Sequence, residues 1–351
     1  MKLSLFDYNL PSELIAQKPM RPRDKSGLFV LDRKTGKTEH KHFYNLPGFL
    51  RKGDVLIMNE TKVFKARLHG TVLGKKVEIF LVRPEGGEWV ALGKPGKKFL
   101  PGTEVSFGKV KARVLQKGQD GTFRIKFKIG HAAIMALANK IGEIPIPPYI
   151  KTVPKKLGDY QTVYAREAGS VAAPTAGLHF TPVLIKKIKK MGVKMVPIVL
   201  HVGLGTFAPV RTPDLSKHKM YAEWVEISKT AADEINLAKK EKRRVVVVGT
   251  TTVRALEGVA AKFKHLKPYK GDINLFIKPG FKFKVADALI TNFHLPKSTL
   301  LVLVSAFAGR KNILDAYNEA VAMRYRFFSF GDAMFISAGL AIAGRELKIK
   351  D

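Results

Sequence analysis

The feature that most constrains the fold is a run of short, alternating segments between Ala66 and Phe127. In one of them, FRIKFKI at residues 123–129, every second residue is apolar and each residue between is arginine or lysine. Side chains of a strand alternate between its two faces, so this period of two predicts strands with one buried and one solvated face. Strands this short, separated at close intervals by glycine or proline, are typical of a small barrel or sandwich.

The rest of the chain has the texture of an α/β protein. The segment TPVLIKKIKKMG predicts a helix with Thr181 as its N-cap and Gly192 just beyond its end. RVVVVGTTTVRALEGVA predicts a buried strand, a turn and a helix, and GLFVLD and GDVLIMNET predict further strands near the N-terminus. We therefore expect the α/β class, with a large α/β domain of residues 1–62 and 150–351 and an inserted small β-barrel domain of residues 63–149.

The charge balance points to a polyanionic partner. The 351 residues include 62 Lys and Arg against 29 Asp and Glu, which gives a formal net charge of +33. An excess of this size favours binding to nucleic acid. The alternative is a lysine bias that serves only solubility, because the lysines are spread along the chain rather than clustered.

Several classes of protein are excluded by composition. The chain contains no cysteine, which excludes disulfides, thiolate nucleophiles and cysteine-held zinc or iron–sulfur sites. The N-terminus lacks the apolar core of a signal peptide. The longest strongly apolar stretch, STLLVLVSAFAG at residues 298–309, is too short to span a bilayer. We expect a soluble, cytoplasmic protein with no membrane partner.

Four loops combine glycine or proline with threonine, serine or asparagine, and each follows a predicted strand or extended segment. They are APTAGLHFT at 173–181, LHVGLGTFAPV at 200–210, VGTTTVRALE at 248–257 and LITNFHLPKSTL at 289–300. In open α/β sheets, ligands bind beyond the carboxyl ends of the strands. Backbone N–H groups and hydroxyls in such loops suit a polar small molecule, so these loops are the predicted ligand site.

Three of these loops contain a histidine that could transfer a proton. His179, His201 and His294 are candidates for a general base or acid, and the alternative for each is a structural hydrogen bond. The turn at Gly249 lacks both glycine-rich phosphate-binding patterns. It is therefore either an anion-binding helix N-terminus or a tight turn capped by threonine. The sequence has no HExxH pattern, and no metal site is predicted.

The segment RYRFFSFGDAMFI at 324–336 interleaves basic and aromatic residues. Aromatic rings and guanidinium groups stack on unpaired bases, which is how single-stranded RNA is usually gripped. Arg324, Arg326 and Phe327 are therefore candidate RNA contacts, with Asp332 as an acceptor for an amine or a base edge. The alternative is a core aromatic cluster with basic flanks.

Together these segments resemble the S-adenosylmethionine:tRNA ribosyltransferase-isomerase family of queuosine biosynthesis. The resemblance begins with FDYNLPSELIAQKPMRPRDKSGLFVLDRKTG and continues through GDVLIMNETKVFKARL, GEIPIPPYI and YQTVYA. It is strongest in GSVAAPTAGLHFT, LHVGLGTFAPV, VGTTTVRALE, DALITNFHLPKSTLLVLVSAFAG and YRFFSFGDAM. These motifs occur in order over nearly the whole chain, and the β-rich segment matches least.

The resemblance implies a large α/β domain carrying a small β-barrel, and an enzyme for which S-adenosylmethionine donates a ribosyl group. The acceptor would be 7-aminomethyl-7-deazaguanine at the wobble position of a tRNA, and the products epoxyqueuosine in tRNA, adenine and methionine. S-adenosylmethionine is then a co-substrate, no metal or prosthetic group is expected, and the chain is expected to be a monomer. The alternatives are an S-adenosylmethionine-dependent tRNA methyltransferase, which the missing glycine-rich fingerprint disfavours, and a non-catalytic RNA-binding protein.

The resemblance also suggests roles for residues of the four loops. His179, His294 and Glu257 are expected to include the groups that transfer protons. Arg254 would pair with the methionine carboxylate or with a neighbouring carboxylate of the protein, and Glu257 could instead pair with Arg254 within their helix. The S-adenosylmethionine site would be shaped by Thr175, Gly177, Gly203, Gly205, Thr206, Gly249, Thr250, Thr251 and Asn292.

The sequence departs from the family pattern in three places. Tyr221 stands where the family usually has histidine, which argues against an indispensable proton transfer there. Asn274 and Lys278 replace the common aspartate and tyrosine, and the added charge could touch RNA. Glu60 replaces the usual aspartate, which keeps a carboxylate and lengthens its reach.

Overall fold

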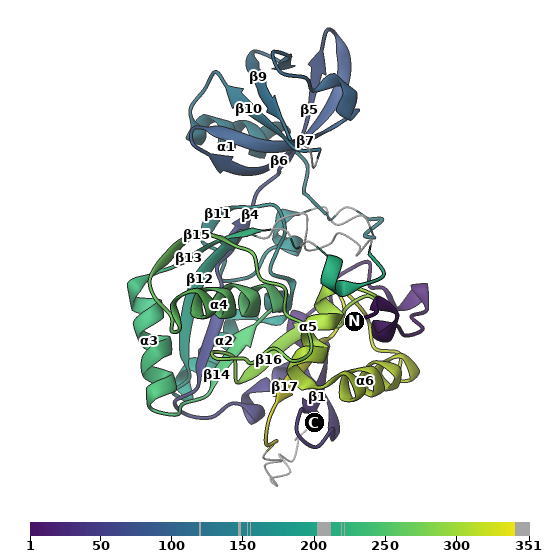
Figure 1. Cartoon of the computed structure of the whole chain (residues 1–351), viewed down its shortest axis with the longest axis vertical. Coiled ribbons are helices and arrows are strands. Elements are labelled where there is room, and N and C mark those ends of the chain that lie inside the picture. Colours follow the sequence, from purple (N-terminus) through teal and green to yellow (C-terminus); the bar gives the residue numbers. More distant parts are fainter. Residues whose placement is uncertain are drawn as a thin grey trace.

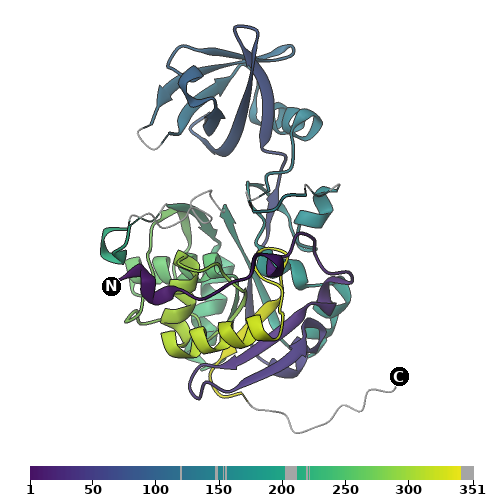
Figure 2. The same ribbon diagram turned by 90° about the vertical axis from the view of Figure 1, so that its right-hand side faces the viewer.

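The computed structural model describes residues 1–118, 121–146, 149–152, 154, 156–201, 212–218, 220 and 222–340. It has a small β-barrel above a larger body in which helices flank a nine-stranded sheet (Figure 1). A view turned by 90° shows that a narrow connection joins the two parts (Figure 2). This architecture confirms the predicted class, an α/β fold that carries a small barrel.

The large sheet is parallel at its centre. In spatial order its strands are β15 (Tyr269–Ile273), β13 (Glu223–Ile227), β12 (Lys194–His201), β3 (Val55–Asn59), β14 (Val245–Val248), β16 (Ala288–Asn292), β17 (Ala333–Ser337), β1 (Gly27–Asp32) and β2 (Thr38–His42). β12, β3, β14 and β16 are parallel, so their carboxyl ends meet at one edge of the sheet. β17 runs antiparallel to β16 and parallel to β1. The apolar runs VLIMN of β3 and VVVV of β14 are fully buried, as strands covered on both faces require.

Helices cover the sheet. They are α2 (Pro182–Lys190), α3 (Lys229–Lys240), α4 (Thr250–Phe263), α5 (Thr299–Ala308) and α6 (Arg310–Ala322). Thr181 caps α2, because its Oγ1 accepts a hydrogen bond from the Leu184 N–H at 3.2 Å. Gly192 follows the helix with φ = +80°, a conformation that favours glycine. Both predicted ends of this helix are confirmed.

The β-rich segment closes into a six-stranded barrel. Its strands are β5 (Arg67–Val72), β6 (Lys75–Glu85), β7 (Glu88–Lys94), β8 (Glu104–Phe107), β9 (Val110–Lys117) and β10 (Phe123–Phe127), and α1 (His131–Ile141) follows them. The alternation in FRIKFKI is confirmed, because Phe123, Ile125 and Phe127 are at most 6% exposed and belong to the barrel core. Two short strands, β4 (Thr61–Val63) and β11 (Glu167–Ser170), pair where the barrel joins the body (Figure 1). The boundaries at residues 63 and 149 stay a prediction.

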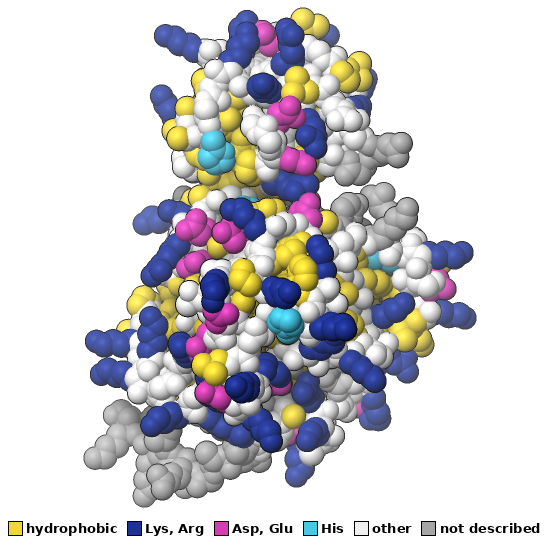
Figure 3. All heavy atoms as spheres, turned by 60° about the vertical axis from the view of Figure 1, so that its left-hand side comes forward, with side chains coloured by type: hydrophobic (Ala, Val, Ile, Leu, Met, Phe, Trp, Pro, Cys, Tyr) yellow, Lys and Arg dark blue, Asp and Glu magenta, His cyan; other side chains and the backbone are white. Residues whose placement is uncertain are grey.

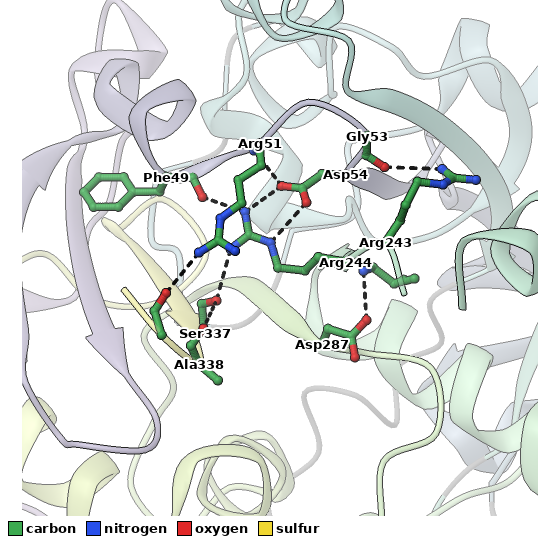
Figure 4. A network of polar contacts seen from close by, with 11 residues as sticks. Phe49, Arg51, Gly53, Asp54, Arg243, Arg244, Asp287, Ser337 and Ala338 are labelled. Atoms are coloured by element: carbon green, nitrogen blue, oxygen red, sulfur yellow. Dashed lines mark hydrogen bonds and ion pairs between the residues drawn. The ribbon is translucent and has the colours of Figure 1, made fainter. Parts of the chain in front are cut away.

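A buried ion pair ties the amino-terminal ends of the parallel strands together (Figure 4). Arg244, just before β14, donates to both carboxylate oxygens of Asp54, at 2.5 and 3.2 Å. The same guanidinium donates to the Phe49 carbonyl at 2.7 Å and to the Ser337 hydroxyl at 3.2 Å. Strands β3, β14 and β17 are thereby fixed at the edge opposite the carboxyl ends.

The positive charge is not confined to one part of the molecule. On the face drawn in Figure 3, lysine and arginine side chains cover the barrel and the body alike. Local lysine density is therefore not enough to identify a binding surface. In the part of the chain that the structure describes, no helix is both long and apolar enough to cross a bilayer.

Candidate active site

A cleft lies at the carboxyl-terminal edge of the parallel strands, where three of the four predicted loops meet. Residues 173–176 contribute to its wall, residues 249–251 follow β14, and residues 291–294 end β16 and continue beyond it. Phe328 and Ser329, from the segment at residues 324–336 (the RYRFF segment), complete the lining. The cleft has a volume of about 480 Å³ up to its open side. Segments far apart in the sequence thus form one site, as expected of loops at this edge of an α/β sheet.

Residues 202–210 of the loop predicted at 200–210 lie outside the described residues. Gly203, Gly205 and Thr206 belong to it, and Tyr221 is likewise not described. His201 ends β12, where its ring stacks on Trp224 with centroids 4.6 Å apart. Burial lowers the pKa of His201 to about 4, so this imidazole is neutral at neutral pH.

The lining of the cleft is polar but uncharged. It consists of Ala173, Pro174, Thr175, Ala176, Gly249, Thr250, Thr251, Thr291, Asn292, Phe293, His294, Leu300, Phe328 and Ser329. None of these residues carries a formal charge at neutral pH, although the chain as a whole is strongly basic. Hydroxyl, carboxamide and imidazole groups orient a ligand by hydrogen bonds without fixing a charge beside it.

Helix α4 begins at the wall of the cleft. Gly249 precedes it with φ = 92° and ψ = 140°, a backbone region that is essentially restricted to glycine. Thr250 and Thr251 form its first turn and line the cleft. The first N–H groups of a helix have no partner within the helix and carry the positive end of its dipole. The cleft therefore has an end that suits an anion such as a carboxylate.

His294 is held firmly at the cleft. Its Nε2 lies 3.0 Å from the Thr291 hydroxyl. The hydroxyl of Tyr8 donates to its carbonyl oxygen at 2.5 Å, and its N–H donates to the Tyr317 hydroxyl oxygen at 3.1 Å. Burial lowers the pKa of His294 to about 3. The residue is consequently neutral and well positioned, with one ring nitrogen already engaged.

His179 lines a second, smaller cavity together with Arg23 and Arg326. The side chain is buried, and its Nδ1 lies 2.7 Å from the hydroxyl of Ser26. Its Nε2 makes no hydrogen bond of acceptable geometry among the described residues. Burial lowers the pKa of His179 to about 4; the Asp332 carboxylate opposes this shift. A buried, neutral imidazole with one open nitrogen is what a general base requires.

Asn292 lines the cleft. Its Nδ2 donates to the Phe328 carbonyl at 2.9 Å, and its Oδ1 is buried without a hydrogen-bond partner in the described part of the chain. The same carboxamide is near enough to His179 to raise the pKa of the imidazole, although the contact lacks hydrogen-bond geometry. Ser329 lines both cavities. Asn292 and His179, which are both predicted site residues, are thus neighbours in the structure.

Thr175 and Gly177 lie on the short 3-10 turn η7 (Thr175–His179), and they have different surroundings. Thr175 lines the cleft, as expected. Gly177 does not, since it packs against Tyr164, and a Cβ atom at this position would overlap the Tyr164 hydroxyl. The glycine therefore shapes the turn through a close contact rather than by touching a ligand.

Two predicted residues of α4 lie away from the cleft, for a clear physical reason. The Glu257 carboxylate accepts hydrogen bonds from the main-chain N–H groups of residues 284–286 at 2.9 to 3.0 Å. Arg254 forms an ion pair of 3.1 Å with Glu223 of β13, and both side chains are at most 5% exposed. Glu257 thus holds the loop at residues 284–286. Of the two partners expected for Arg254, the structure shows the neighbouring protein carboxylate.

The RYRFF segment mostly builds the core. Phe327 is fully buried among aromatic rings, so it is not available to stack on RNA. Asp332 is 6% exposed and accepts from the Gly27 N–H and from the Arg326 guanidinium, both at 2.9 Å. Arg324 is exposed and Arg326 half-buried. For Phe327 and Asp332 the structure favours the core alternative. Arg326 is paired with Asp332, so the exposed Arg324 is the better candidate for an RNA contact.

Sequence reasoning missed the residues that hold the two histidines. Ser26 and Tyr8 come from the N-terminal segment, far from the histidines they contact. No local pattern marks either one, because their role exists only after the sheet has brought the segments together. Thr291 was recognisable in principle, since it lies three residues before His294 in the LITNFH motif. In the described ranges, no group of three or more His, Asp or Glu side chains is placed to hold a metal ion.

Known proteins similar to this chain carry closely related names. The family model described as queuosine biosynthesis protein matches residues 3–336. A protein of Moorella thermoacetica named S-adenosylmethionine:tRNA ribosyltransferase-isomerase is 51% identical over 341 residues, which span 96% of this chain and 100% of that protein. One of the same name from Carboxydothermus hydrogenoformans is 52% identical over 340 residues, with 96% and 100% covered. The crystal structure of S-adenosylmethionine tRNA ribosyltransferase from Thermotoga maritima is 40% identical, covers 95% of this chain and 100% of its own, and has a TM-score of 0.57.

Proposed function

Because the chain belongs to the queuosine biosynthesis protein family, we propose that its uncharged cleft is the active site of an S-adenosylmethionine:tRNA ribosyltransferase-isomerase. The enzyme transfers and isomerises the ribosyl moiety of S-adenosylmethionine onto 7-aminomethyl-7-deazaguanine at the tRNA wobble position. The products are epoxyqueuosine-tRNA, adenine and methionine. One observation carries the placement of the site: three of the motifs that link the chain to this family converge on one cleft at the N-terminus of α4.

The charge of the cleft and its polar groups suit S-adenosylmethionine as a ligand. The methionine carboxylate would lie against the first N–H groups of α4, at Thr250 and Thr251, where the helix dipole favours an anion. Arg254 is not needed for this purpose, since its guanidinium is buried against Glu223. The sulfonium and the adenine would meet hydroxyls and apolar groups, without a lysine or arginine in the lining to repel the sulfonium.

Proton removal from the donor requires a neutral base. The carbon between the sulfonium and the ribose ring is acidified by the positive sulfur, and loss of its proton gives an ylide that can expel adenine. His179 is the preferred base, because its Nε2 is buried without a hydrogen bond in the described part of the chain, while Nδ1 contacts Ser26. Its lowered pKa keeps the imidazole in the proton-accepting form at neutral pH. His294, whose Nε2 contacts Thr291, is better placed to orient the donor or to act on the leaving adenine.

The acceptor amine must lose its proton before it attacks. The second cavity is lined by Arg23, whose guanidinium donates to the Gln161 carbonyl at 2.7 Å and to the Gly158 carbonyl. A cation beside the amine lowers the amine's pKa and favours its neutral, nucleophilic form. The second cavity is small, so few water molecules fit there beside a reactive intermediate, and this limits side reactions.

The partners of the proposed enzyme follow from its substrates. tRNA bearing the deazaguanine precursor is the acceptor, S-adenosylmethionine is the co-substrate, and no prosthetic group takes part in the proposed steps. We place the enzyme in the cytoplasm, where tRNA is modified, and expect it to act as a monomer.

Release of adenine tests the proposed reaction directly. The protein is mixed with S-adenosylmethionine and an anticodon stem–loop that carries the precursor base, and the small products are separated by chromatography. Adenine and methionine should appear in equal amounts and only when both substrates are present. Release of S-adenosylhomocysteine instead would identify a methyltransferase and overturn the proposal.

A further inference from the structure

A basic groove lies beside the cleft, on the other side of the η7 turn. It is lined by Val163, Tyr164, Ala165, Arg166, Pro182, Ile185, Lys186, Lys189 and Lys190, and it has a volume of about 1200 Å³ up to its open side. The lining includes apolar residues, among them Val163, which is 43% exposed. No acidic residue is among the described residues of the lining. An open groove lined by apolar and cationic side chains has the chemistry to hold an RNA strand.

The cations of the groove are free of ion pairs within the described part of the chain. Salt bridges engage many other surface lysines and arginines, but none of them includes Arg166, Lys186, Lys189 or Lys190. Burial raises the pKa of Glu60, and the positive charge of Arg166 opposes this shift. These groups are thus available to an anionic partner from outside the chain.

The arrangement on α2 concentrates positive charge on one side of the helix. Lys186, Lys189 and Lys190 are spaced by three and four residues, so their side chains project from the same face. Like charges at this spacing repel one another. The helix dipole accounts for lysines in the last turn, but it does not account for Arg166, which comes from a different segment and meets the same groove.

The groove and the cleft share a wall. Tyr164 lines the groove, and its hydroxyl lies against Gly177 in the middle of η7. Thr175 and Ala176 of the same turn line the cleft. A polyanion held in the groove is therefore separated from the proposed reaction site by a single turn of chain.

We propose that this groove, with Arg166, Lys186, Lys189 and Lys190, holds the phosphate backbone of the substrate tRNA next to the nucleotide that enters the cleft. The inference rests on the proposed function for the identity of its occupant. It goes beyond that function by assigning the RNA backbone a surface in a protein whose lysines are spread over barrel and body alike. It also gives Lys189 and Lys190, in the last turn of α2, a role apart from helix stability.

The test compares two variants that lose the same charge at different places. In the first, Lys186, Lys189 and Lys190 are replaced by glutamine; in the control, Lys34, Lys240 and Lys242 are replaced in the same way. The control lysines are exposed and lie outside the groove. Binding of the full-length proteins to a fluorescent anticodon stem–loop is measured by anisotropy over a series of salt concentrations. Removal of one lysine–phosphate interaction lowers the slope of log K against log salt by about 0.7 to 0.9.

The groove variant should bind at least tenfold more weakly at low salt, with a slope reduced by about 2 to 3. The control should keep the slope of the native protein, and Lys187→Gln, which changes the same helix outside the groove, should do the same. Turnover at saturating RNA should be retained by the groove variant. Equal losses in the two triple variants would overturn the proposal, because net charge alone would then explain the effect.

The outcomes separate this inference from the proposed function. Native protein that binds the stem–loop through the groove but releases no adenine would contradict the proposed reaction and support the groove. Native protein that releases adenine, together with a groove variant of unchanged affinity, would contradict the groove and leave the reaction supported. Thermal melting of each variant shows that the compared proteins are folded.

Discussion

The hydroxyl of Ser26 lies 2.7 Å from Nδ1 of His179, although 153 residues separate the two in the sequence. Ser26 immediately precedes β1, while His179 ends the η7 turn at the cleft. Contact at Nδ1 determines which ring nitrogen is left to act. Here Nε2 is the one left, in the small cavity that adjoins the cleft at Ser329.

Loss of the Ser26 hydroxyl should impair turnover through His179. We expect Ser26→Ala to lower kcat roughly tenfold, since about 1.4 kcal/mol of misorientation is enough for that factor. His179→Ala should lower kcat at least hundredfold, as loss of a general base usually does. Single-turnover adenine release at saturating substrates measures both. The control is Ser4→Ala, which changes an exposed serine and should leave turnover unchanged. Near-native turnover by His179→Ala would show that His179 is not the base.

Acid should destabilise the protein through its buried histidines. The pKa of His179 is lowered to about 4 and that of His294 to about 3, against about 6.5 in the unfolded chain. Between these values the unfolded state binds more protons than the folded state, so the free energy of unfolding falls as pH drops from 6.5 towards 4. His294→Gln should reduce this slope by close to one proton, roughly 1.4 kcal/mol per pH unit. Urea unfolding at several pH values measures the slope.

The matched control is His265→Gln, because His265 is exposed. Its slope should equal that of the native protein. A native stability that stays constant between pH 6.5 and 4 would show that the buried histidines are not neutral as described.

Gly177 should tolerate a larger side chain only when its neighbour is made smaller. Gly177→Ala places a methyl group against the Tyr164 hydroxyl, and overpacking of this kind costs about 1–3 kcal/mol. Removing the hydroxyl in Gly177→Ala/Tyr164→Phe should restore part of that stability. Denaturant unfolding of the two single variants and the double variant gives the coupling energy between the sites. Strict additivity would mean that the two groups do not touch.

Gly249 should be irreplaceable for backbone reasons. Gly249→Ala forces a Cβ into a conformation with φ = 92° and ψ = 140°, and we expect a loss of about 1–3 kcal/mol. It should also weaken S-adenosylmethionine binding, because the start of α4 would shift. Gly96→Ala, where a Cβ meets nothing within 4 Å and φ is not positive, should change stability by less than about 0.5 kcal/mol. Calorimetry with the donor measures the affinity.

Arg254 should act in stability rather than in donor binding. Arg254→Met leaves Glu223 buried without its cation, which typically costs about 3–5 kcal/mol. The double variant Arg254→Met/Glu223→Leu should recover most of that loss, because both charges of this buried pair are removed together. Under conditions where the double variant is folded, its KM for S-adenosylmethionine should stay within about threefold of the native value. A much larger rise would return Arg254 to the methionine carboxylate.

The sequence predicts the fold well where the signal is periodic. The alternation in FRIKFKI marks the barrel, and the Thr181 cap with Gly192 marks both ends of α2. It predicts less of the site, because roles depend on partners from distant segments. The sequence alone suggests a catalytic carboxylate at Glu257, whereas the structure shows this carboxylate bound by three N–H groups of residues 284–286. The sequence suggests that Phe327 stacks on RNA bases, whereas in the structure its ring packs against Tyr8, Phe293 and Tyr317.

Mass spectrometry of the acceptor RNA tests the central claim most directly. An anticodon stem–loop that carries 7-aminomethyl-7-deazaguanine at the wobble position is incubated with the protein and with S-adenosylmethionine labelled in its ribose. The account predicts that the wobble nucleotide gains the labelled ribosyl-derived group, and that His179→Ala slows this gain at least hundredfold. An unlabelled wobble base, or one that gains only a methyl group, would contradict it.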